Sequence, residues 1–135
     1  MFAEGAAQSL ACQTAGTANQ KQVIAARFAW CPRTASDVAN MEGGGSGAGV
    51  AVDEYLSPSD AGRFCLAAAS AELPSDFSYQ AVACCSKVPE GGVQRWDLSE
   101  AKALLGWEPA DTWPDGVREI LADNDGGYTN VDGLF

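Results

Sequence analysis

The segment over residues 96–112 constrains the fold most. It reads Trp-Asp-Leu-Ser-Glu-Ala-Lys-Ala-Leu-Leu-Gly-Trp-Glu-Pro-Ala-Asp-Thr. Asp97 is placed to cap a short helix. Glu100 follows three residues later, where its side chain can accept a hydrogen bond from the backbone N–H of the capping residue. Gly106 supplies a left-handed stop, and Pro109 makes the chain leave in an extended conformation. The segment therefore predicts a short, well-delimited helix whose apolar side consists of Ala101, Leu104 and Leu105.

Hydrophobic spacing predicts further elements along the chain. Alanines at helical spacing predict a helix over residues 2–15, and Ser57 followed by proline predicts the start of a second helix that ends before Pro74. The apolar stripe of this second helix consists of Ala61, Phe64, Cys65, Ala68 and Ala69. The other expected elements are mostly buried strands over residues 22–30 and 77–84, a very short strand at Tyr55 and Leu56, a loop over 33–50 and a final helix over 114–121.

This order of elements indicates an α/β fold with a few strands and flanking helices. We expect one α/β region over residues 1–122, interrupted by a flexible glycine-rich loop at about 42–50. A turn-rich tail follows over residues 123–135. A chain of 135 residues with 47% hydrophobic content is long enough for one core.

The formal net charge of −10 argues against nucleic-acid binding, because contacts to phosphates need a basic surface. The chain contains no apolar run of about 18–20 residues, the length that spans a bilayer. We therefore expect a soluble, acidic protein without a membrane span.

The cysteines and the absence of histidine limit the possible chemistry. Five cysteines, an odd number, do not form the pattern of a disulfide framework, so we expect buried reduced thiols in an intracellular or organellar, reducing compartment. Without histidine, Ser-His-Asp and Cys-His catalysis are excluded, and a zinc site would need an unusual ligand set. We assign no catalytic residue and no metal ligand. The acidic pair Asp53 and Glu54 is expected to be solvated turn residues.

Two features have both a structural and a functional interpretation. Residues 43–48 formally match the glycine pattern of a dinucleotide-binding turn, but no predicted strand precedes them, so a flexible linker is favoured. Arg27 lies within an apolar strand, where a structural ion pair is favoured over a ligand contact. Trp30, Cys31 and Arg33 follow the carboxyl end of that strand, the position where ligands sit in open α/β sheets, and are candidate cleft residues.

Several segments resemble the C-terminal part of the extended short-chain dehydrogenases/reductases, closest to the uronate dehydrogenases within the NAD-dependent epimerase/dehydratase family. Phe-Ala-Glu at residues 2–4 is similar to the Phe-Gly-Glu that follows the active-site helix of that family. Arg-Phe-Ala-Trp-Cys at 27–31 is similar to a strand end near the nicotinamide. Tyr-Leu-Ser-Pro-Ser-Asp at 55–60 and the segment over 96–112 match two later motifs. The resemblance covers residues 2 to about 118.

The resemblance implies a region whose Rossmann half is missing. It places the catalytic lysine of the family before Met1, and no Tyr-x-x-x-Lys occurs in the sequence. We therefore expect no cofactor for this chain alone, although the parent family implies NAD or NADP. The expected function is a non-catalytic accessory or interaction subunit of a larger protein assembly, with Phe2, Ala6 and Ile24 at the partner interface. The alternative is the substrate-side fragment of an NAD(P)-dependent epimerase or uronate dehydrogenase whose cofactor-binding half is supplied elsewhere.

Overall fold

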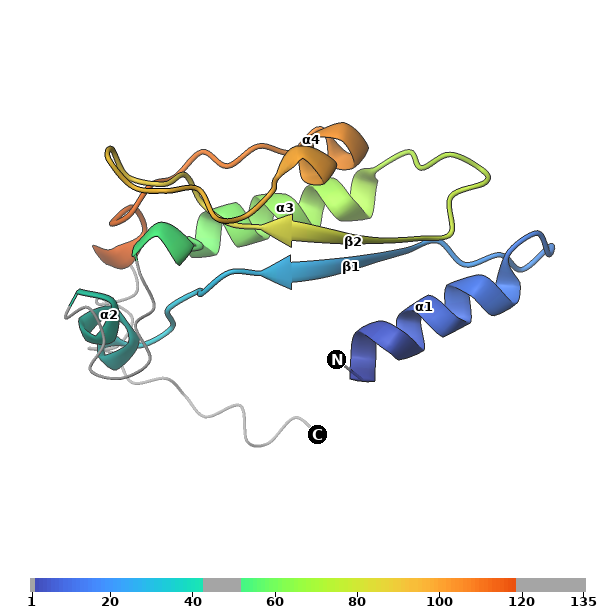
Figure 1. Cartoon of the computed structure of the whole chain (residues 1–135), viewed down its shortest axis with the longest axis horizontal. Coiled ribbons are helices and arrows are strands. Elements are labelled where there is room, and N and C mark those ends of the chain that lie inside the picture. The colour runs from blue at the N-terminus through green and yellow to red at the C-terminus, as the bar shows by residue number, and fades with distance from the viewer. Residues whose placement is uncertain (1, 43–51, 119–135) are drawn as a thin grey trace.

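The computed structural model describes residues 2–42 and 52–118, which form a two-stranded parallel sheet with helices around it (Figure 1). This arrangement confirms the predicted α/β class. The elements in chain order are α1 (Phe2–Thr14), β1 (Val23–Phe28), α2 (Ala35–Glu42), the 3-10 helix η1 (Val52–Glu54), α3 (Pro58–Ser70), β2 (Tyr79–Cys84) and α4 (Ser99–Leu105).

The two strands run in register from Val23 opposite Tyr79 to Phe28 opposite Cys84. Since side chains alternate between the faces of a strand, Tyr79 and Arg27 share one face of the sheet and Phe28 lies on the other. The face with Tyr79 and Arg27 is contacted by α1 through Glu4, and the face with Phe28 is contacted by α3. The sheet therefore separates α1 from α3.

The main core lies between β2, α3 and the segment around α4. Phe64 is 1% exposed, and its ring makes edge contacts with Phe28 at 5.8 Å and with Trp107 at 5.3 Å between centroids. The predicted burial of Phe64 is thus confirmed. Cys65, predicted to share that buried stripe, is exposed, because the buried face of α3 is centred on Asp60 and Phe64. The buried members of this core are Ala29, Leu56, Phe64, Val82, Cys84, Cys85, Ala101 and Trp107.

The prediction that β1 is mostly buried is wrong for its second half. Val23 through Ala25 are half-buried, whereas Ala26 through Phe28 are exposed. In the described part of the chain only β2 pairs with β1, so the other edge of β1 has no neighbouring strand. In β2, by contrast, Val82 and Cys84 are fully buried. The buried character of β1 would require a further strand beside it.

The predicted loop over residues 33–50 is corrected at its start, where α2 forms. The Thr34 hydroxyl accepts a hydrogen bond from the Asp37 N–H at 3.1 Å, and the Asp37 carboxylate accepts from the Arg33 and Thr34 N–H groups at 3.0 Å. These reciprocal contacts are a capping box, which initiates a helix. They also lower the pKa of Asp37, chiefly through the Arg33 N–H. The glycine-rich loop beyond residue 42 lies outside the described residues.

The starts of the later helices differ in detail. Ser57 caps α3 as predicted, accepting from the Asp60 N–H at 2.9 Å. At α4 the capping position is Leu98, and Asp97 lies one residue earlier, where it accepts from the Ser99 N–H at 2.9 Å. The predicted Asp97 cap is therefore displaced by one residue, and Glu100 does not complete it.

The remaining expectations are confirmed in part. Gly106 ends α4 with φ 63°, the left-handed stop that was predicted. The short strand at Tyr55 is a single parallel bridge to Trp30. Residues 113–116 form a turn and helical conformation begins only at Val117, so the helix predicted from residue 114 starts later. The rest of that helix and the tail over 123–135 lie outside the described residues.

Candidate functional site

The three predicted cleft residues follow β1 in the chain. Trp30 is tied by its backbone, since its N–H donates to Glu54 and its carbonyl accepts from Leu56, and its indole is 43% exposed. Cys31 is half-buried and Arg33 is exposed. Burial raises the pKa of the Cys31 thiol, and the nearby positive charge of Arg33 opposes this shift. The thiol is therefore held in its protonated, weakly nucleophilic form.

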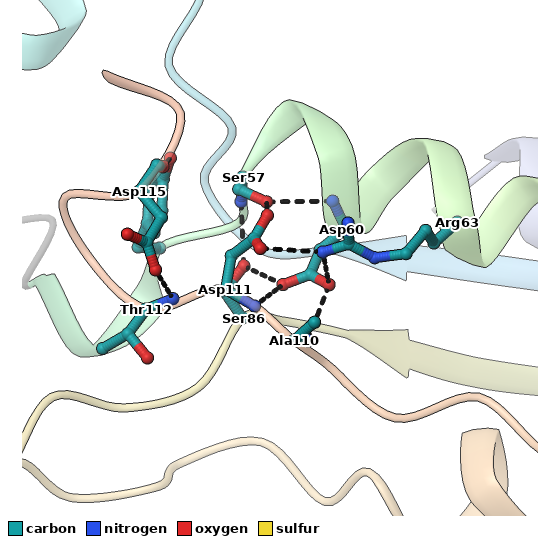
Figure 2. Close-up of polar contacts among 9 residues, drawn as sticks. Ser57, Asp60, Arg63, Ser86, Ala110, Asp111, Thr112 and Asp115 are labelled. Carbon is teal, nitrogen blue, oxygen red and sulfur yellow. Dashed lines mark hydrogen bonds and ion pairs between the residues drawn. The ribbon is translucent and has the colours of Figure 1, made fainter. Parts of the chain in front are cut away.

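Among the described residues, the Asp60 carboxylate at the start of α3 is the most extensively hydrogen-bonded side chain (Figure 2). One oxygen, Oδ1, accepts from Arg63 at 2.7 Å and from the Ala110 N–H at 2.9 Å. The other, Oδ2, accepts from the Ser86 hydroxyl at 2.7 Å and from the Asp111 N–H at 3.1 Å. The side chain of Asp60 is completely buried.

Neighbouring contacts extend this cluster. Arg63 also pairs with the Asp111 carboxylate at 2.9 Å, and the Ser57 hydroxyl donates to that carboxylate. The Ser57 N–H donates to the Ser86 hydroxyl at 2.9 Å. The cluster joins α3, the end of β2 and the segment after α4, as Figure 2 shows. We call these five side chains the Asp60 cluster: Ser57, Asp60, Arg63, Ser86 and Asp111.

The electrostatics of the Asp60 cluster favour a structural role. Burial alone would raise the pKa of Asp60, but hydrogen bonds from Ala110, Ser86, Arg63 and Asp111 outweigh it and lower the pKa. A carboxylate that is already ionised and accepts four hydrogen bonds is a poor proton donor and acceptor at neutral pH. Local sequence patterns place Asp60 only in the first turn of a predicted helix, because its partners at 110–111 are fifty residues away.

The carboxylates of η1 correct another expectation. Asp53 is not a solvated turn residue: it is 9% exposed and pairs with Arg95 at 3.1 Å, and Glu54 pairs with the same guanidinium at 3.5 Å. The buried thiol of Cys85 donates a hydrogen bond to the carbonyl of Tyr55, the residue after η1, at 3.3 Å. Burial, assisted by the charges of Asp53 and Glu54, raises the pKa of Cys85 to about 11.

The five cysteines differ in exposure: two are exposed, two are buried and Cys31 is half-buried. All five are free thiols, and the prediction of buried thiols is confirmed for Cys84 and Cys85 but wrong for Cys12 and Cys65, which are exposed. Within residues 2–42 and 52–118, no group of three or more His, Cys, Asp or Glu side chains could hold a metal ion. No helix in the same ranges is long and apolar enough to cross a membrane.

An open groove of about 330 Å³ lies between α1 and the unpaired edge of β1. We call it the β1-edge groove; it is lined by Glu4, Ala7, Val23, Ile24, Ala25, Ala26 and Arg27. Arg27 pairs with Glu4 at 2.7 Å, which confirms the predicted ion pair, and Glu4 also accepts from the Tyr79 hydroxyl at 3.2 Å.

The three predicted interface residues lie on the two elements that border this groove. Ile24 lines the groove and is half-buried, and Ala6 is exposed on α1. Phe2 begins α1, but its side chain lies outside the described part of the structure. Of the described side chains among these three residues, Ile24 is the one that lines the groove, and the predicted cleft residues lie beyond the end of β1. Comparisons with known proteins add no relative: no family model, curated protein or solved structure matches the chain.

Proposed function

We propose that this chain is a non-catalytic interaction subunit, derived from the substrate-side region of an extended short-chain dehydrogenase/reductase, that docks on another protein through α1 and β1. The observation that carries the proposal is the edge of β1 that no strand within residues 2–42 and 52–118 covers, beside an open groove. Parallel sheets occur almost only with their faces covered, and a free strand edge is a template for pairing with another chain.

Exposed apolar side chains on the same elements support docking. Leu10 of α1 is 49% exposed, and Phe28 at the end of β1 is 45% exposed. Trp30 follows two residues later and is also exposed. Exposed apolar side chains on α1 and at the end of β1 are surfaces that a partner could cover. The hydrogen-bonded carboxylate of Asp60 and the raised pKa of Cys31 and Cys85 support a non-catalytic role.

The proposal is tested on the native assembly. The full chain, purified from its source, is expected to sediment with a partner protein. Ala6→Asp places a charge on the exposed side of α1 and should release the chain as a folded monomer. Ala103→Asp is the matched control, because Ala103 is an exposed alanine on α4, and it should stay bound. A chain that is a stable monomer at its source, or an Ala6→Asp variant that stays bound, contradicts the proposal.

The parallel direction of β1 and β2 favours a second candidate. A partner that carried the cofactor-binding half of a reductase would extend this sheet with further parallel strands, and the assembly would then be an NAD(P)-dependent oxidoreductase. Calorimetric titration with NAD and NADP separates the two candidates. The isolated chain is expected to bind neither cofactor; micromolar binding by the assembly alone would support the second candidate, and binding by the isolated chain would contradict both.

A further inference from the structure

The backbone of β1 carries a row of outward-facing hydrogen-bonding groups. The Val23 N–H donates to Ser78 and the Ala29 N–H donates to Cys84, both at 2.9 Å, so the odd-numbered residues of β1 face β2. Alternate residues of a strand direct their backbone groups to opposite edges. The N–H and C=O groups of Ile24, Ala26 and Phe28 therefore face the other edge, which has no neighbouring strand among the described residues, and they lie about 6.6 Å apart along the strand.

We infer that the β1-edge groove receives an extended segment of a different polypeptide, which adds to the sheet as a third strand beside β1. This inference rests on the proposed function and specifies the kind of partner. Only an extended backbone presents donors and acceptors at the repeat of Ile24, Ala26 and Phe28. The groove is bordered by β1 along its length and by Ala7 of α1, a small side chain that leaves room for the added strand.

The two faces beside this edge are already built to cover an added strand. The ring of Phe28 packs against Phe64 of α3 on one face of the sheet and is 45% exposed. On the other face α1 contacts β1 through the Glu4–Arg27 pair. Ala25 and Ala26 are small, so β-branched side chains on the added strand would find space beside them.

Charge identifies the class of occupant. Among the described residues, the charged side chains that line the groove are Glu4 and Arg27, which neutralise one another, so the centre of the added strand is uncharged. The whole chain carries a formal charge of −10, which repels a second copy of itself. The occupant is therefore a strand of another protein, apolar or uncharged at its centre and neutral to basic at its ends.

A synthetic strand tests the inference on the full chain. The probe is the acetylated and amidated peptide Lys-Thr-Val-Thr-Val-Thr-Lys, and its control carries N-methyl groups on the three central residues, which block both edges. Amide-resolved NMR is expected to show shifts and about tenfold slower hydrogen exchange at Ile24, Ala26 and Phe28 with the probe only. Shifts elsewhere, or equal binding of the N-methylated peptide, overturn the inference.

A proline variant gives the second arm. Ala26→Pro removes one outward N–H and leaves the bonds between β1 and β2 in place, because proline is tolerated where the N–H of an edge strand faces solvent. It should weaken the probe about tenfold or more, whereas Ala26→Val, which keeps the N–H, should not. Equal affinity for both variants overturns the inference. If Ala26→Pro does not fold, the two peptides decide alone.

Binding of the variants to the native partner distinguishes strand addition from the proposed function. If Ala6→Asp releases the chain from its partner but Ala26→Pro does not, strand addition is overturned and the proposed interaction subunit stands. Retention of both variants would contradict the proposed function itself. A free chain that sediments as a dimer, and becomes a monomer in Ala26→Pro, would show a second copy at the edge and overturn the choice of a different polypeptide.

Discussion

Replacing Asp60 by asparagine tests whether the Asp60 cluster stabilises the fold. Asparagine has nearly the same shape but only one acceptor oxygen, and its amide group would face two of the four donors now bound by Asp60. If the amide group replaces Oδ1, the two donors are Arg63 and the Ala110 N–H. If it replaces Oδ2, they are the Ser86 hydroxyl and the Asp111 N–H. Each donor left without an acceptor costs about 1–3 kcal/mol, so the two unpaired donors in Asp60→Asn should lower the free energy of unfolding by about 2–6 kcal/mol.

Urea unfolding measures this loss as a lower midpoint at unchanged slope. The matched control is Asp97→Asn, because Asp97 is exposed and accepts only the Ser99 N–H; we expect a loss below about 1 kcal/mol. The Asp60 pKa is lowered in the folded chain, so its contribution is present above the unfolded pKa of about 3.9 and is lost as pH falls through the folded value. The variant should therefore approach the parent in strong acid. A loss at neutral pH no larger than that of the control would refute the reasoning.

Three further predictions concern the core, one helix end and the thiols. Phe64→Ala should lower the free energy of unfolding by about 3 kcal/mol or more, measured by urea unfolding; a loss below about 1 kcal/mol would contradict its central place in the core. Gly106→Ala should cost about 1 kcal/mol by the same assay through backbone strain alone, since its φ is 63° and no atom crowds the position; no loss would contradict the left-handed stop. A thiol reagent should modify the two exposed cysteines in the folded chain and the two buried ones only after unfolding, and rapid modification of all four would contradict the burial. The exposed pair is Cys12 and Cys65, and the buried pair is Cys84 and Cys85.

The local signals in the sequence predicted most elements because they act over a few residues. Ser57 with its following proline placed the start of α3, and Gly106 placed the end of α4. The same kind of signal was available for α2 in the Thr34 and Asp37 capping box, but the glycines after residue 42 led to a loop assignment. The error at Asp97 is one residue, within the usual uncertainty of a helix start.

Burial and the site depended on contacts that local patterns do not encode. The exposed half of β1 follows from the absence of a second neighbouring strand in the described chain, which composition does not report. The Asp60 cluster depends on residues about fifty positions apart, and Asp53 is buried by its pairing with Arg95. The interface around β1 stays a prediction: the apolar residues of β1 imply a cover, and within the described residues only β2 pairs with this strand.

The Asp60 carboxylate also orders the assembly of the chain. Oδ1 and Oδ2 each gain their second hydrogen bond only when the N–H groups of residues 110 and 111 pack against them. This contact closes a loop of about fifty residues, which costs conformational entropy. A chain that extends only to residue 86 contains the two side-chain partners of Asp60, Ser86 and Arg63, but neither of the two backbone donors. Truncation just before residue 110 should therefore leave α3 poorly anchored, although every residue of α3, β2 and α4 would be present.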